Sequence, residues 1–400
     1  MNILYLCDEY PPGRHGGIGT SVQLLARAMV RSGHNVVAAG LYSPGYGGED
    51  EFEDEGVRVY RFRRKFDAKW LTDRSLPFRI YNRVLKDTGL MEWDIKKSLL
   101  VYKQQLEKII TEHKIDIIEM PDYNDYVRFC KTYVPFPQLS VPVVIKMNGS
   151  ITYFAAEANK QAPPHIIKME QTILNQAAAV ASASKYTADK SAICLSYPHK
   201  IEVLYNGIDV TISILTNKNP KQVIFTGTLT EKKGIYQLAK AWNVVNKTIP
   251  DARLLVLGKG DKKSVIKYLS AEAKKTVSFM GHVATKKLYE YLGSSAVGVF
   301  PSYAEAFALA PLEAMACGTA VINSNRTSGP ELIADNIDGL LIDPDDTAQI
   351  ATAILYLLNN PGICAKLAKK GNEKVKELFD INKIAADNIR FYNSVLKNRT

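Results

Sequence analysis

Two glutamates, Glu305 and Glu313, flank a run of small residues in the second half of the chain. An apolar stretch that we expect to form a strand, 296–300, ends shortly before them. Pro311 suits the first turn of a helix and Gly318 its C-terminal cap, which places Glu313 in the first helical turn. The amides of the intervening loop can face a phosphate, and the two carboxylates can bracket a diphosphate. One would reach sugar hydroxyls and the other ribose hydroxyls.

Each glutamate also has a plainer explanation. Glu313 alone is a charge favoured near a helix N-terminus, and Glu305 alone is a surface loop acid. The proline and glycine that punctuate the same segment make the pair a stronger signal than either residue.

A glycine-rich loop with Gly16 and Gly17 follows the first expected strand and opens a helix. Such a loop lets backbone N–H groups approach an anion, although a tight turn needs the same small residues. It matches the dinucleotide pattern GxGxxG poorly. The second expected strand ends at Gly40 without an acid to hold a ribose, which counts against a nicotinamide enzyme.

Short β-rich runs alternate with helical stretches in two successive series, as in parallel doubly wound sheets. The sequence therefore predicts two Rossmann-like α/β domains that face a central cleft. We expect domains at 1–200 and 201–381, with a last helix, 382–400, packing back on the first. The expected strands are 2–6, 35–40, 57–62, 115–119, 142–146 and 179–182, then 222–226, 253–257, 276–280, 296–300 and 319–322.

The composition, 46% hydrophobic and 23% charged, is that of a soluble globular protein. The N-terminal apolar run is too short for a signal peptide, and no stretch approaches the roughly 20 apolar residues of a membrane span. Five scattered cysteines fit free thiols in a reducing cytosol, so we expect a cytoplasmic protein. Neither the cysteines nor the six histidines show metal-ligand spacing, and we expect no metal.

The segment 57–108 carries 14 Lys/Arg against 6 Asp/Glu, after an acidic run at 49–55. It could be a solvated helical face, or a patch for anionic lipid or an anionic acceptor. No nucleic-acid module accompanies the charge, so we expect no nucleic acid partner. The residues that suit a peripheral membrane contact are Arg58, Arg61, Arg63, Arg64, Lys65, Phe66 and Trp70.

The glutamate segment and five further segments, in order, resemble the retaining GT-B-fold glycosyltransferases of the large "group 1" family. They cover nearly the whole chain. The glutamate segment resembles that family's E-x7-E motif. The others are the Gly16-Gly17 loop, Asn206-Gly207-Ile208-Asp209, Phe225–Gly234, and the strand-end turns at Leu257–Gly260 and Phe279–Gly281.

The resemblance implies a hexosyltransferase that moves a sugar from a nucleotide-sugar, UDP-linked rather than GDP-linked, to a sugar, glycan or lipid-linked acceptor. No cofactor is implied, since the nucleotide-sugar is a substrate. The residues implied to be catalytic are Lys233, Glu305 and Asn148. Those implied to bind the donor are Gly16, Gly17, Lys233, Glu305, Phe307, Ala308, Leu309 and Glu313.

The chain departs from the family at two positions. Thr228 stands where the family usually has an arginine, and Asn148 where it often has a histidine. Lys232 or Arg14 could replace the missing cation, and Asn148 can still hydrogen-bond a hydroxyl. The alternatives are another GT-B enzyme such as a sugar-nucleotide epimerase or phosphorylase, a Rossmann-type oxidoreductase, and a non-catalytic nucleotide-sugar-binding protein.

Overall fold

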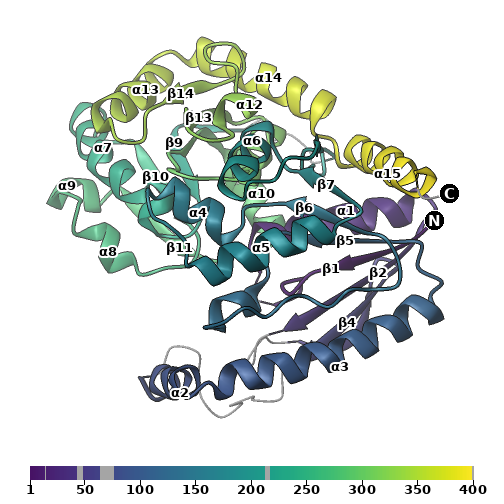
Figure 1. Cartoon of the computed structure of the whole chain (residues 1–400). Helices are drawn as coiled ribbons and strands as arrows, with labels where there is room; N and C mark the ends of the chain where they lie inside the picture. The colour runs from purple at the N-terminus through teal and green to yellow at the C-terminus, as the bar shows by residue number, and fades with distance from the viewer. Residues whose placement is uncertain (14, 43–47, 64–75, 212–216, 399–400) are drawn as a thin grey trace. The chain divides into compact units, whose positions relative to one another are not determined.

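The computed structural model describes residues 1–13, 15–42, 48–63, 76–211 and 217–398 (Figure 1). The chain divides into two compact units, one of Met1–Gly207 with Ile381–Thr400 and the other of Ile208–Asp380. The chain passes between the units at Gly207/Ile208, a few residues beyond the boundary we expected at 200/201. It returns at Asp380/Ile381.

The sheet of the first unit is covered on both faces by helices. Its central strand β1 (Asn2–Leu6) alternates its side chains between two cores, as an extended chain must. Ile3 and Tyr5 pack with α1 (Gly17–Arg31) and α15 (Ile381–Lys397). Leu4 and Leu6 pack with α3 (Leu90–Glu112) and α5 (Pro164–Gln176).

The strands of this sheet run in the order β3-β4-β2-β1-β5-β6-β7-β8, with β3 antiparallel to β4 and the other described pairs parallel. The order reverses between β1 and β5, where loops leave toward opposite faces. The remaining elements are β2 (Asn35–Tyr42), β3 (Glu51–Asp54), β4 (Val57–Arg63), α2 (Leu76–Asp87), β5 (Ile117–Pro121), η1 (Asp125–Phe129), β6 (Val143–Met147), α4 (Ile151–Glu157), β7 (Ala179–Ser182), α6 (Lys185–Cys194) and β8 (Ile201–Val203).

The second unit holds a parallel sheet in the order β11-β10-β9-β12-β13-β14. The order reverses between β9 (Asn219–Thr226) and β12 (Ser295–Phe300), which are hydrogen-bonded neighbours. In open α/β sheets, ligands bind outside the carboxyl ends of strands at such a switch point. The other elements are η2 (Glu231–Lys233), α7 (Ile235–Thr248), β10 (Arg253–Leu257), α8 (Lys262–Ile266), α9 (Ala271–Lys274), β11 (Val277–Gly281), α10 (Thr285–Ser294), α11 (Leu309–Ala316), β13 (Ala320–Ser324), α12 (Gly329–Leu332), β14 (Leu340–Ile342), α13 (Thr347–Asn359) and α14 (Pro361–Leu378).

Three short strands, β3, β8 and β14, were not predicted from the sequence. β3 lies in the acidic run, Glu51-Phe52-Glu53-Asp54, whose composition does not suggest a strand. Pairing with β4 stabilises it there. In the described parts of the chain, no single helix has the length and apolarity to cross a bilayer, and α13 with α14 meet that test only as a pair bent by 102°.

Candidate active site

The loops that follow β9 and β12 touch at the carboxyl edge of the second sheet. The N–H of Tyr303 donates to the carbonyl of Lys232 at 2.8 Å. Gly234, at φ +69°, lies so close to the other loop that a Cβ would be 1.8 Å from the carbonyl oxygen of Pro301. Glycine is therefore required at this contact, both for its backbone conformation and for its lack of a side chain.

This contact brings Lys233 and Glu305 together as an ion pair. The Lys233 Nζ lies 2.5 Å from the Glu305 Oε1, and the side chains are 30% and 16% exposed. Burial opposes ionisation of Glu305, but Lys233 and then Lys232 outweigh it, so the pKa of this carboxyl lies below its usual value. Glu305 is consequently a carboxylate at neutral pH, beside two cations of which Lys232 is one candidate replacement for the family's arginine. Arg14, the other candidate, lies outside the described residues.

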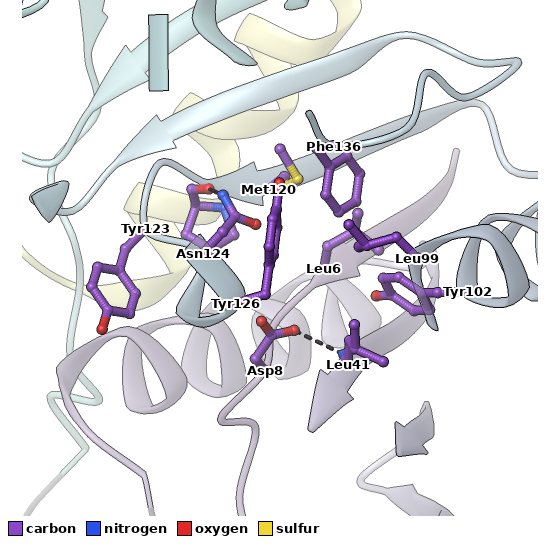
Figure 2. Close-up of a pocket in the computed structure, with 11 residues that line it drawn as sticks. Leu6, Asp8, Leu41, Leu99, Tyr102, Met120, Tyr123, Asn124, Tyr126 and Phe136 are labelled. Carbon is purple, nitrogen blue, oxygen red and sulfur yellow. Dashed lines mark hydrogen bonds between the residues drawn. The ribbon is translucent and has the colours of Figure 1, made fainter. Parts of the chain in front are cut away.

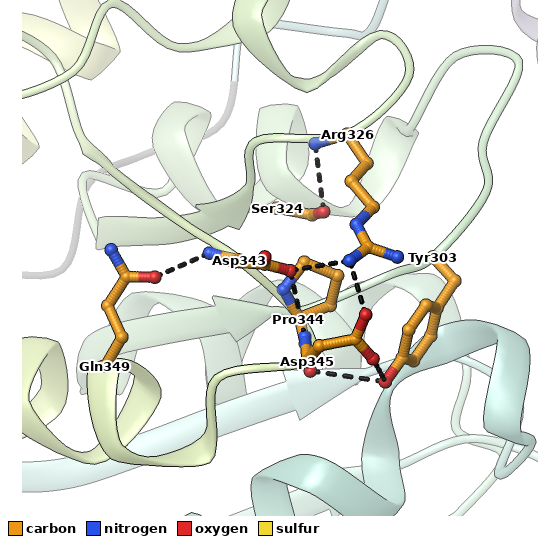
Figure 3. Close-up of polar contacts among 7 residues, drawn as sticks. All are labelled: Tyr303, Ser324, Arg326, Asp343, Pro344, Asp345 and Gln349. Atoms are coloured by element: carbon orange, nitrogen blue, oxygen red, sulfur yellow. Dashed lines mark hydrogen bonds and ion pairs between the residues drawn. The ribbon is translucent and has the colours of Figure 1, made fainter.

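The loop that carries Glu305 is tied to its neighbours by polar contacts, and Figure 3 shows those of Tyr303 and Arg326 with Asp343 and Asp345. The backbone N–H of Glu305 donates to Thr327 Oγ1 at 3.2 Å. Thr327 has a φ of +53°, a conformation that β-branched residues rarely adopt. Its neighbour Arg326 bridges Asp343 at 2.8 Å and Asp345 at 2.5 Å, and Asp345 also accepts from the hydroxyl of Tyr303 at 2.8 Å.

Sequence reasoning missed Thr327 and Arg326. The positive φ of Thr327 could not be read from its residue type, because β-branched residues rarely adopt this conformation. The contacts of Arg326 join the loops after β12, β13 and β14, which are far apart in the sequence. They could not be predicted from the sequence because only the folded sheet brings these strand ends together.

Helix α11 points an uncapped N-terminus toward the β12 loop. It begins at Leu309, and no described side chain caps it at Ala308. The N-cap residue thus offers no side-chain acceptor to the first amides, and the helix dipole favours an anion there. Phe307, just before the helix, is buried with its ring 5.8 Å from that of Phe379.

The prediction that Glu313 lies in the first helical turn is wrong. The helix starts two residues before Pro311, so Glu313 is its fifth residue, whereas Gly318 follows the C-cap as expected, at φ +68°. Burial raises the pKa of Glu313 to about 7, and no described residue hydrogen-bonds its carboxyl group.

In the first unit, Gly16 is the N-cap of α1 and Gly17 its first residue. The carboxylate of Glu9 already accepts hydrogen bonds from the N–H groups of Gly16, at 3.1 Å, and of Gly19, at 2.8 Å. The carboxylate of Glu9 is thus an internal anion for two amides of this loop, and the donor-binding role of Gly16 and Gly17 stays a prediction. Gly17 faces open space.

Asn148 follows β6 and takes part in a network of its own unit. Its N–H donates to Asp122 Oδ1 at 2.8 Å, and its Oδ1 accepts from Asn206 Nδ2 at 3.2 Å. Burial raises the pKa of Asp122 to about 7, and the other oxygen of Asp122 has no described hydrogen-bonding partner. Asn148 thus holds the end of the segment Asn206-Gly207 as well as presenting its side chain at the strand edge.

The basic residues expected to face a membrane are engaged within the first unit or lie outside the described residues. Arg61 is buried and donates to the carbonyls of Tyr10 and Pro12, so the prediction that it contacts a membrane is wrong. Arg58 is 45% exposed, as strand alternation predicted, but both it and Arg63 form ion pairs with the acidic segment. Outside the described residues lie Arg64, Lys65, Phe66 and Trp70.

Helices α2 and α3 of the first unit each expose apolar side chains. Ile80 and Val84 on α2, one helical turn apart, are 55% and 53% exposed. Trp93 on α3 is 51% exposed, and the ammonium of Lys97 lies 3.9 Å from its ring centroid. The charges of this segment are evident in its sequence, whereas the exposure of its apolar side chains is evident only in the structure.

Within the described residues, no group of three or more His, Cys, Asp or Glu side chains could hold a metal ion. All five cysteines are free.

Comparison with known proteins accounts for both units. Residues 211–374 match the sequence profile of the family "Glycosyl transferases group 1", and residues 15–212 that of "Glycosyltransferase Family 4". An uncharacterised glycosyltransferase from Methanocaldococcus jannaschii is 26% identical over 99% of both chains.

Among solved structures, the sucrose-phosphate synthase of Thermosynechococcus elongatus has a TM-score of 0.76 at 20% identity, over 100% of both chains. HepE from Anabaena, in complex with UDP-glucose, has a TM-score of 0.64 at 16% identity, over 98% of this chain and 100% of that one.

Proposed function

Because this chain is a group 1 glycosyltransferase with the GT-B fold, we propose that it transfers a hexosyl group from a UDP-sugar to an acceptor hydroxyl, with retention at the anomeric carbon. The observation that carries the proposal is the Lys233–Glu305 pair at the switch point of the second sheet. It lies beside the uncapped start of α11, so cation, carboxylate and amides are all available to one donor.

Each residue then has a distinct part in donor binding. Lys233 would turn from Glu305 to the donor diphosphate, while the amides at Phe307, Ala308 and Leu309 bind its oxygens. Glu305 would then accept from hydroxyls of the donor sugar, and Glu313 from those of the ribose. As the bond to the anomeric carbon breaks, negative charge grows on the diphosphate, and fixed positive groups stabilise it. The departing phosphate would take the acceptor proton.

UDP is the nucleotide we favour, since a protein of the same fold, HepE, binds UDP-glucose. A thermal-shift panel with UDP-, GDP- and ADP-glucose tests donor binding, because a ligand of the folded state must raise its stability. We expect UDP-glucose to raise the Tm of the wild type and to do so less for Lys233→Ala. Equal shifts in the two proteins would contradict the role of Lys233.

A second assay separates transfer from the alternatives. Transfer requires that nucleoside diphosphate appears only when an acceptor is present, whereas release without one indicates hydrolysis or epimerisation. Nuclear magnetic resonance of the product reports its anomeric configuration, and an inverted product would contradict retention. Stabilisation by a nicotinamide cofactor would instead favour an oxidoreductase.

We also propose that the exposed face of α2 and α3 rests on anionic membrane in a cytoplasmic setting. Ile80, Val84 and Trp93 offer apolar and aromatic contact, and Lys97 supplies positive charge beside them. Aromatic side chains favour the headgroup region, and basic ones are attracted to anionic lipid.

A further inference from the structure

Helix α14 packs against α11, the helix whose start we propose to bind the donor diphosphate. Near the carboxyl end of α11, the side chain of Asn372 donates to the carbonyls of Met315 and Ala316, at 3.1 Å and 2.8 Å. Asn372 is buried, and these two carbonyls belong to the last turn of α11, where a helix leaves its acceptors unsatisfied. One end of α11 is therefore held by α14.

The opposite end of α11 lies beside Phe379, the C-cap residue of α14. Its ring centroid is 5.8 Å from that of Phe307, which comes immediately before Ala308, the N-cap residue of α11. The two rings are tilted by 58° to each other, and Phe379 and Phe307 are 1% and 8% exposed. Tilted aromatic pairs stabilise each other beyond the burial of their area. Phe379 therefore supports a residue directly at the amides that the donor would contact.

Phe379 is itself fixed through its backbone. Its N–H donates to the carbonyl of Val375 at 2.9 Å, and its carbonyl accepts from the N–H of Ile208 at 2.9 Å. Ile208 and Asp380 also form a parallel bridge, so the segments in which the chain enters and leaves the second unit are paired at this point. The ring of Phe379 is thus attached to backbone that is held on both sides, and it can act as a rigid support for Phe307.

We propose that Phe379 is a positioning residue of the donor site, which acts through Phe307 to hold the amides of Phe307, Ala308 and Leu309 in place for the diphosphate. A hydrogen-bond donor contributes most when its position is fixed before the ligand arrives, because binding then does not have to order it. Together with Asn372, Phe379 makes α14 the element that holds both ends of α11. This inference rests on the proposed function and gives Phe379 no direct part in the chemistry.

Phe379→Leu and Phe379→Met test the proposal, because both remove the ring, and the flexible methionine fills the space if leucine prevents folding. The matched control is Leu367→Ala, at a buried position of the same helix whose side chain packs with those of α7 and α13. Each protein is titrated with UDP by isothermal calorimetry, and its free energy of unfolding is measured in urea. Phe307→Leu, alone and combined with each Phe379 variant, completes a double-mutant cycle.

We expect both Phe379 variants to raise the Kd of UDP about fivefold, whereas Leu367→Ala lowers stability and leaves the Kd unchanged. In the Phe307→Leu background, the Phe379 variants should raise the Kd by less than about twofold, because the ring through which Phe379 acts is already missing.

Full additivity in the double variants would overturn the proposal, since Phe379 would then act independently of Phe307. An unchanged Kd in both Phe379 variants would also overturn it, and so would a loss of UDP binding in Leu367→Ala as large as theirs. In each of these cases wild type still binds UDP and the proposed donor stands. If wild type does not bind UDP, the proposed donor and this inference are both wrong.

Discussion

Glu305 and Glu313 have the same side chain, but the fold shifts their pKa values in opposite directions. Lys233 and Lys232 keep Glu305 ionised despite its burial. Glu313 has no such cation, and burial alone raises its pKa to about 7. Glu305 stays ionised, so its partner Lys233 can move to the donor diphosphate and leave a carboxylate for the donor sugar. Glu313 titrates near neutrality, so its charge depends on the group that binds beside it.

The first prediction concerns both glutamates. Glu305→Ala and Glu313→Ala should each lower kcat/KM at least tenfold, about 1.4 kcal/mol, because each removes a contact to the donor. Circular dichroism should show that both variants stay folded. Wild-type turnover in the double variant would remove these residues from the site.

The acidity of Glu313 predicts a dependence of stability on pH. Its pKa in the folded state, about 7, lies above the value of about 4.5 expected when unfolded. The folded state therefore holds the proton more tightly, and stability falls as pH rises from about 4.5 to about 7. Glu313→Gln cannot ionise, so it should escape this loss.

The measurement is urea unfolding of Glu313→Gln and wild type at pH 5 and pH 8. We expect the variant to gain on the order of 1 kcal/mol relative to wild type between the two values, allowing for the partial exposure of Glu313. A difference that stays the same at both pH values would refute the raised pKa.

At the scale of elements, the site depends on the contact between the loops after β9 and β12, which requires a glycine at position 234. Gly234 and Gly281 have the same φ of +69°, but only Gly234 has another loop where its side chain would be. Gly281→Ala should cost about 1 kcal/mol for the left-handed backbone alone. Gly234→Ala should cost more than about 3 kcal/mol, because the β12 loop must also move.

Thermal unfolding of both variants measures this difference, and UDP-glucose binding shows its functional effect. Equal losses of stability would mean that the contact with Pro301 relaxes freely.

The surface of α2 and α3 predicts reversible membrane binding. The protein should pellet with phosphatidylglycerol vesicles at low ionic strength and leave them at high ionic strength, because salt screens the attraction of the basic residues. Trp93→Ala should weaken pelleting, while Val244→Ala, an exposed apolar residue on α7 of the other unit, should not. Absence of pelleting at low salt rules the membrane contact out and favours a soluble acceptor.

For the whole molecule, charge compensation by the protein predicts that activity survives EDTA. The Lys233 ammonium and the start of α11 supply positive charge where the diphosphate would bind. Turnover of UDP-glucose should be equal with and without the chelator. Loss that Mg²⁺ or Mn²⁺ restores would show that a metal helps to hold the diphosphate.

Periodicity and punctuation in the sequence were enough to predict two parallel α/β sheets, because apolar runs and glycine turns are local signals. They located most strands to within a few residues, but not the acidic β3, which depends on pairing with β4. They also misplaced the start of α11 and thereby Glu313, since a helix start without a capping side chain leaves no mark in the sequence.

The sequence by itself determined which chemistry is present: the spaced glutamates, the lysines before Gly234 and the order of the family's segments. Only the tertiary structure decided how these groups act on one another. The adjacency of β9 and β12 pairs Lys233 with Glu305, and burial separates the acidities of the two glutamates. In the folded chain, Arg61 and Glu9 also form hydrogen bonds with other residues of the first unit. The buried hydroxyl of Tyr102, by contrast, has no hydrogen-bonding partner among the described residues (Figure 2). Electrostatics and burial depend on distances through space, and those are fixed only when distant segments pack together.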